Sequence, residues 1–212
     1  GYTVSTTYSM SDSAFSSSQV TIDMGDMGTV GLWNNAGGAG LTKYNDMMPT
    51  AGEQVWDDSD TDDNGIPTHD NDNMLGYNGT FGAVGVSLAY VNGGSGSTGG
   101  GASDTSWVIT YDGLMDGLSV GVGMGENGTT QDLSTAWAKY TAGSITVGFQ
   151  KSEVDNTGST ADEEATAIAA SIAINENLSV SAGKHDVDMG AGKVDEESTG
   201  FSASYTMGST TI

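Results

Sequence analysis

Apolar and polar residues alternate along most of this chain, in short runs separated by Gly, Asn, Asp and Ser. In the first run, Tyr2, Val4 and Tyr8 fall on one side of an extended segment, and Thr3 and Ser5 fall on the other. A period of two residues predicts β-strands that have one apolar and one polar face. Because this pattern recurs to the end of the chain, we expect an all-β fold.

About twelve complete strands are expected, followed by the start of another. The expected strands cover residues 2–10, 19–24, 29–34, 74–78, 84–91, 107–111, 118–124, 132–140, 145–149, 168–174, 178–182 and 201–207, with a further start at 209–212. Residues 11–18 are expected to form a polar loop. Short turns and longer polar loops alternate between the strands, which is typical of a transmembrane antiparallel up-and-down β-barrel.

One connection, residues 34–73, is much longer than the rest. It contains both prolines, Pro49 and Pro67, and many acidic residues against a single base, Lys43. Long structureless connections in compact domains are uncommon unless they serve a function. We therefore expect residues 1–212 to form a single barrel domain, with residues 34–73 folded inward as a loop that narrows its pore.

Composition limits the alternatives. Hydrophobic residues make up 36% of the 212 residues, and the formal net charge is −23, with five basic residues in all. Such an acidic surface argues against nucleic acid as a partner, since phosphates need basic side chains. A soluble β-sandwich or solenoid also fits the alternation. The Thr, Ser, Gly and Gln of the polar faces suit a water-filled lumen better than a dry core.

The sequence contains no convincing catalytic arrangement, so we do not expect an enzyme. Residues 117–121 match the letters of a nucleophile elbow, but that motif requires a turn from a strand into a helix. Ser119 instead lies inside an alternating strand. His69 and His185 are isolated in the sequence, and cysteine is absent.

The acids of the long loop suggest a cation site. Ca²⁺ binds several hard oxygen ligands on flexible loops. The spacing predicts a calcium site formed by Asp58, Asp60, Asp62 and Asn64. The alternative to a role of these acids in the pore is a solvated acidic loop that lies outside it.

The chain resembles the general diffusion porins of the alphaproteobacterial (Rhodobacter-like) type. The resemblance rests on residues 19–31, on the acidic loop with Ile66 and Pro67, on the hairpin of residues 79–90, and on the order in which they occur. It implies a trimeric barrel of sixteen strands in the Gram-negative outer membrane, in contact with outer-membrane lipids and lipopolysaccharide. Counted against that barrel, the chain has about 12–13 strands and is incomplete at both ends.

In such porins, acids on the inward-folded loop face basic residues on the opposite wall of the barrel. The resemblance therefore implies a set of constriction residues in this chain. They are Glu53, Asp57, Asp58, Asp60, Asp62 and Asp63 on the loop, and Lys139 and Lys151 as the candidate bases.

Two functions follow from these patterns. The first is an outer-membrane porin, a homotrimer that passes small hydrophilic solutes and ions by passive diffusion and favours cations because its loop is acidic. It needs no cofactor, although Ca²⁺ could bind its loop. The second is a secreted or surface-layer acidic β-rich structural protein that binds calcium.

Overall fold

The computed structural model describes residues 1–11, 14–52, 54, 65–68, 72–94, 101–158, 160–190, 192–207 and 210–211. These residues form two short helices, the 3-10 helix η1 (Gly25–Met27) and the α-helix α1 (Gly40–Tyr44). They also form thirteen strands: β1 (Thr3–Ser11), β2 (Ala14–Asp23), β3 (Thr29–Asn34), β4 (Met74–Phe81), β5 (Val84–Val91), β6 (Asp104–Tyr111), β7 (Leu118–Asn127), β8 (Gln131–Ala142), β9 (Ile145–Asn156), β10 (Glu163–Ala173), β11 (Leu178–Asp188), β12 (Glu196–Met207) and β13 (Thr210–Thr211).

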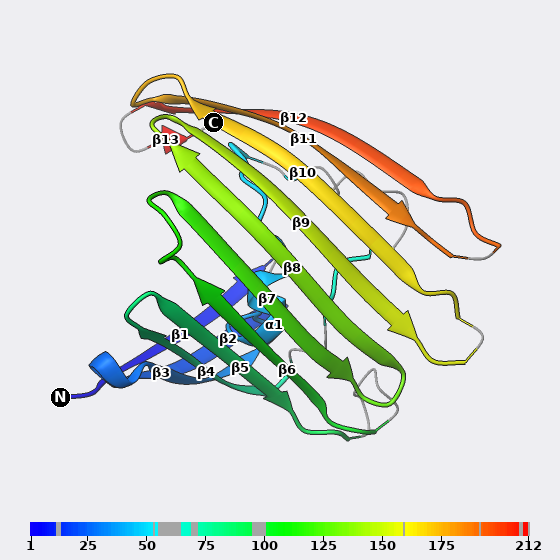
Figure 1. The fold of residues 1–212 in the computed structure, drawn as a ribbon. Coiled ribbons are helices and arrows are strands. Elements are labelled where there is room, and N and C mark those ends of the chain that lie inside the picture. The colour runs from blue at the N-terminus through cyan, green and yellow to red at the C-terminus, as the bar shows by residue number, and fades with distance from the viewer. Residues whose placement is uncertain are drawn as a thin grey trace.

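All thirteen strands belong to one antiparallel sheet, in which each strand pairs with its neighbours in the sequence. The predicted all-β, antiparallel up-and-down architecture is thus confirmed. Figure 1 shows the sheet curling into a barrel wall with α1 on its concave side. Because alternate connections of such a sheet lie on the same rim, the three longest connections share a rim: residues 35–73, 92–103 and 189–195.

Side chains alternate between the concave inner face and the convex outer face. In β9, Gln150, Ser152 and Val154 are buried on the inner face, whereas Phe149 and Lys151 are exposed on the outer face. This is the period of two that the sequence predicts, because successive Cβ atoms of a strand point to opposite sides.

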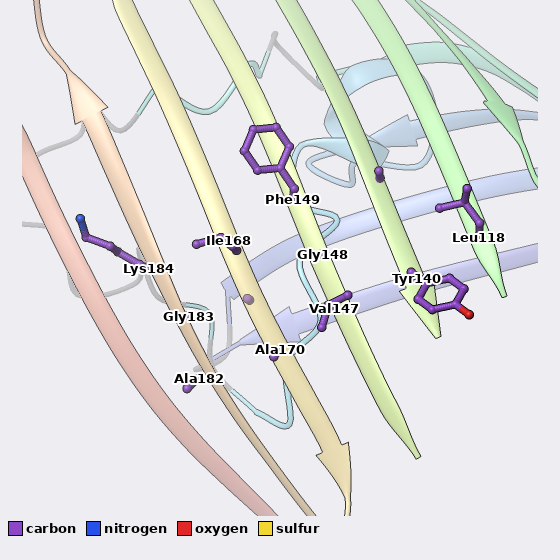
Figure 2. Close-up of a pocket in the computed structure, with 12 residues that line it drawn as sticks. Leu118, Tyr140, Val147, Gly148, Phe149, Ile168, Ala170, Ala182, Gly183 and Lys184 are labelled. Atoms are coloured by element: carbon purple, nitrogen blue, oxygen red, sulfur yellow. The ribbon is translucent and has the colours of Figure 1, made fainter. Parts of the chain in front are cut away.

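The outer face is apolar and uncovered in this chain. Ile168 is 57% exposed, and Ile109, Val122 and Phe149 are each more than 40% exposed. Figure 2 shows Tyr140, Val147, Phe149 and Ile168 on this face of adjacent strands. They help to line a shallow apolar groove of about 600 Å³. Water-soluble proteins rarely expose so continuous an apolar surface.

The buried core lies between the inner face and the chain that follows β3, and not between two sheets. Trp33 and Met74 pack with Ala39, and Leu41 packs with residues of β6, β8 and β9. Further along, Met48 packs on the small residues Ala167 and Ala169. The core therefore fixes the described parts of the long connection against the wall.

Tight turns on the other rim depend on glycine. Gly143 joins β8 to β9 with a φ of 60°, and Gly82 joins β4 to β5 with a φ of 64°. Glycine adopts this left-handed conformation without the steric cost that a Cβ atom brings. None of the helices in the described part of the chain is long and apolar enough to cross a membrane.

The structure differs from the sequence prediction in strand length. The loop predicted at residues 11–18 is wrong, because β2 already begins at Ala14 and pairs with β1 through Ser17 and Ser18. The ring of Phe15 also contacts that of Tyr8, with their centroids 5.3 Å apart. Backbone pairing and this contact outweigh the turn preference of the serines.

Several strands extend beyond their predicted bounds into acidic segments. β9 continues to Asn156, β11 continues to Asp188, and β12 begins at Glu196. Paired strands can extend beyond the apolar band, and charged side chains there are solvated at no great cost. Acidic residues therefore show where the strands approach the rim of this sheet. They do not show where the strands end.

Candidate pore constriction

The long connection enters the interior through α1, whose first N–H groups bond to the wall. The N–H of Gly40 donates to Oγ of Ser87 at 2.8 Å, and the N–H of Leu41 donates to Oγ of Ser106 at 3.0 Å. The first N–H groups of a helix have no partner within it, and the preceding Ala39 offers no side-chain cap. Two wall serines therefore act as the cap.

Asn78 of β4 makes a second attachment. Its Nδ2 donates to the carbonyl of Gly38 at 2.9 Å, and its Oδ1 accepts from Nζ of Lys43 at 3.0 Å. The same Oδ1 accepts from the hydroxyl of Ser87 at 2.7 Å. One amide thus joins both ends of α1 to the wall.

Gln150 of β9 makes a third attachment, further along the connection. Its Oε1 accepts from the N–H of Met47 at 2.8 Å, and its Nε2 donates to the carbonyl of Asn45 at 3.0 Å. Nε2 also donates to Oγ1 of Thr135 at 2.9 Å, and that hydroxyl lies 2.9 Å from the hydroxyl of Ser152. Because the side chain is buried, these bonds are shielded from competing water.

The chain then crosses to later strands. The N–H of Ala51 donates to Oγ of Ser181 on β11 at 2.9 Å. A Cβ atom at Gly148 would lie 2.5 Å from Cδ of Pro49, so a larger residue there would displace the chain. Near the return, the N–H of Gly65 donates to Oε2 of the buried Glu163 at 3.1 Å, and Pro67 is fully buried.

These contacts place the described parts of residues 34–73 on the inner face, from β4 to β11. Most of these attachments use a serine or an amide side chain at an inward position of a strand, and Gly65 is held by the carboxylate of Glu163. The described parts of this connection fold inward, as the sequence predicts, although the wall residues that hold them carry no recognisable motif.

The predicted acidic constriction residues, Glu53, Asp57, Asp58, Asp60, Asp62 and Asp63, lie outside the described residues, as does the predicted calcium ligand Asn64. The calcium site therefore stays a prediction. Within the part of the chain that the structure describes, no group of three or more His, Cys, Asp or Glu side chains is placed to hold a metal ion.

The two predicted bases lie on opposite faces of the wall. Lys139 of β8 shares the inner face with Thr135 and Trp137. Lys151 lies on the outer face of β9, where Nζ is 2.9 Å from Oε1 of Glu164. The assignment of Lys151 to the pore is therefore wrong, because it shares the orientation of Phe149, two residues away.

Lys43 is a luminal base that the sequence pattern does not single out. Its side chain as a whole is exposed to solvent, although its ammonium group is partly desolvated and lies 5.3 Å from the centroid of the Tyr44 ring. Burial lowers the pKa of Lys43, since desolvation disfavours the charged form. Burial, and secondly the charge of Asp112, raises the pKa of Tyr44.

Lys43 and Tyr44 border a polar cavity of about 590 Å³ between α1 and the rim of tight turns. Asp26 and Asp112 line it from the turns, together with the hydroxyl groups of Thr29, Thr80, Thr110 and Ser119. The ring of Tyr44 stacks on Trp137, with an interplanar angle of 10° and centroids 6.5 Å apart. The interior is thus polar where the loop leaves it open.

An uncovered apolar outer face, a polar inner face and a chain segment bonded inside the wall define a class of protein: a membrane β-barrel with an inserted loop. Residues 2–212 match the family model described as Gram-negative porin. The chain belongs to the Gram-negative porin family and is a protein of the outer membrane.

Solved structures agree with this fold. The anion-selective porin from Comamonas acidovorans superposes with a TM-score of 0.65 at 16% identity, over 92% of this chain and 64% of that one. A porin refined at 1.8 Å resolution gives 0.67 at 16% identity, over 98% and 82% of the two chains. OmpT of Vibrio cholerae gives 0.66 at 16% identity, over 94% and 68%.

At these identities the superpositions show the fold alone, and this chain spans 64% of the length of the Comamonas protein. A comparison with curated protein sequences finds no match. Family membership and the apolar outer face support the porin over the secreted or surface-layer alternative.

Proposed function

We propose that the complete protein forms a water-filled pore for passive diffusion of small hydrophilic solutes and ions. The observation that carries this proposal is the attachment of the described parts of residues 34–73 to the inner face through Asn78, Gln150 and Ser181. A segment held there narrows the lumen without blocking it. No bond is made or broken in the solute.

Single-channel recording of the full-length protein in a planar bilayer tests this function. Stepwise conductance from protein that retains its β-sheet circular dichroism is the expected result. Absence of channels from such folded protein would overturn the proposal.

We further propose that the pore favours cations because the acids of residues 53–63 lie along its narrowest part. Rings of Asp and Glu select cations in other pores. Replacing Asp57, Asp58 and Asp60 together by Asn should shift the reversal potential in a salt gradient toward that of a nonselective pore. An unchanged reversal potential would place these acids outside the constriction.

Within the family, we propose the alphaproteobacterial (Rhodobacter-like) type and a homotrimer embedded among outer-membrane lipids and lipopolysaccharide. One superposed structure, OmpT of Vibrio cholerae, is described as a trimer form, with a TM-score of 0.54 at 14% identity. Conductance steps grouped in threes, and a trimer mass in detergent by light scattering, are the expected results. A monomer mass with single steps would contradict the trimer.

Calcium binding by the acidic loop is a separate proposal. Clustered carboxylates repel one another unless a cation lies between them. Calorimetric titration with CaCl₂ should detect binding that is lost when Asp58, Asp60 and Asp62 are replaced by Asn. Equal heats from the two proteins would remove the site.

A further inference from the structure

The cavity of about 590 Å³ below α1 contains a cationic group that lacks an acidic partner in the described part of the chain. There, Lys151 and Lys184 each form ion pairs, with carboxylate oxygens 2.8–2.9 Å from their ammonium groups. No such pair forms at Lys43, whose amine donates to Asn78. An ammonium has three N–H donors, so two remain for a solute in the cavity.

One hydrogen bond, to Asn78, holds this ammonium, and the accepting amide is itself fixed in place. Oδ1 of Asn78, which accepts its hydrogen bond, also accepts from Ser87, while Nδ2 of the same amide is held by the carbonyl of Gly38. Ser87 in turn accepts from the N–H of Gly40. The amide is therefore fixed on both sides, and it holds Lys43 at the edge of the cavity.

Carboxylates lie at a different part of the same cavity. Asp112 and Asp26 line it from the tight turns that follow β6 and β2. Burial, and secondly the charge of Asp112, raises the pKa of Tyr44, whereas burial lowers the pKa of Lys43. Among the described residues no ion pair joins Lys43 to either carboxylate, so the two signs of charge do not neutralise each other by contact.

We propose that this cavity is a binding subsite for small zwitterionic solutes, whose carboxylate contacts Lys43 and whose ammonium contacts Asp112. Uncharged hydroxyl groups of Thr80, Thr110 and Ser119 line the space between these ends. A simple anion would gain Lys43 but meet two carboxylates, and a simple cation would meet Lys43. A solute that carries both charges satisfies both ends.

The subsite rests on the proposed porin function, because solutes must enter the lumen to reach it. Its acids, Asp26 and Asp112, belong to the tight turns of the wall, whereas Lys43 is carried by the long connection, on the side of α1 that faces the rim of tight turns.

The test is the ion current of the full-length protein in a planar bilayer, measured at low salt with added 4-aminobutyrate. Butyrate and butylammonium serve as probes that carry one charge each. We expect a saturable fall in current with 4-aminobutyrate, with an apparent affinity about twofold to fivefold higher than for either single-charge probe. Equal effects of butyrate and 4-aminobutyrate would show a bare anion site and overturn the proposal.

Variants locate the effect. Lys43→Gln and Asp112→Asn should each remove the advantage of 4-aminobutyrate over the single-charge probes. Lys139→Gln, which removes another inner-face charge that does not line this cavity, should preserve that advantage. If Lys139→Gln abolished it equally, the effect would come from overall luminal charge and the subsite would be refuted.

The two proposals fail in different ways. Folded protein without any current would contradict the pore itself. Normal current with the same response to all three probes would leave the pore standing and remove the subsite.

Discussion

The N–H of Met47 donates to Oε1 of Gln150 at 2.8 Å, joining residues 103 positions apart in the sequence. The same side chain donates through Nε2 to the carbonyl of Asn45 at 3.0 Å. A backbone segment inside a lumen has no sheet partners, so an amide from the wall replaces them. Glutamine suits this position because it presents a donor and an acceptor together.

Replacing Gln150 by Leu should loosen the loop at this point. Loss of these buried hydrogen bonds is expected to reduce the free energy of unfolding by about 1–3 kcal/mol and to raise open-channel current noise. Gln131→Leu is the matched control. It removes bonds to Asn127 and Asn156 at the rim and none to the loop. Equal noise in the two variants would show that Gln150 does not hold the loop.

Gly121 of β7 lies beneath the indole of Trp137. A Cβ atom at residue 121 would lie 2.5 Å from the indole ring, closer than carbon atoms approach each other. Trp137 also stacks on Tyr44, so a displaced indole would disturb the loop. We expect Gly121→Ala to destabilise the protein by about 1–3 kcal/mol, as overpacking does.

Thermal unfolding in detergent, followed by circular dichroism, measures this effect. Gly52→Ala is the control, because a Cβ atom at that loop position would meet Ser202 at an ordinary distance of 3.5 Å. A similar melting temperature for Gly121→Ala and the unmodified protein would mean that the indole relocates without cost.

The two faces of the wall should respond in opposite ways to a charge. Ile109 of β6 is 44% exposed on the outer face, which contacts lipid hydrocarbon in the outer membrane. Ile109→Arg should cost about 2–4 kcal/mol if the residue lies near the middle of the bilayer. Ser5→Arg on the polar face of β1 should cost little, since that side chain meets water. Refolding yields in lipid vesicles measure the difference, and equal yields would contradict the assignment of faces.

The number and order of strands could be predicted from alternation alone. Each strand has one apolar and one polar face, so each one shows a period of two in the sequence. Strand ends could not. At Ser17 and Ser18 the sequence favours a turn, yet backbone pairing with β1 continues. At Asp188 and Glu196 the acids lie where strands leave the apolar band and remain paired.

The alternation of apolar and polar residues also predicts which face of β9 carries Lys151. Phe149 belongs to the outward set, and two residues later the side chain must point the same way. The prediction was wrong because charge alone was used to choose the base. Parity along β8 places Lys139 on the inner face, next to Trp137.

Lys43 and its network could not be found in the same way. Its environment depends on Asn78 and Ser87, which come from strands that follow the loop in sequence. Neither residue belongs to a motif, and the short helix α1 has no capping side chain of its own. Only the folded wall brings these groups together.

The lowered pKa of Lys43 leads to a prediction about pH. Burial disfavours the charged amine, so Lys43 releases its proton below the ordinary value of 10.5. Between that lowered pKa and 10.5 the unfolded chain binds more protons at this residue than the folded chain. The contribution of Lys43 to stability therefore rises with pH through this window and is unfavourable below it.

Selectivity should follow the same titration. When Lys43 loses its proton, the lumen loses a fixed positive charge, so cation preference should increase as pH rises through that window. Burial, and secondly the charge of Asp112, raises the pKa of Tyr44, which moves its ionisation away from this titration. Reversal potentials in a KCl gradient, recorded from pH 7 upward, should show a step that is absent from Lys43→Gln. The same step in the variant would assign the titration to another group and would remove Lys43 from the conducting path.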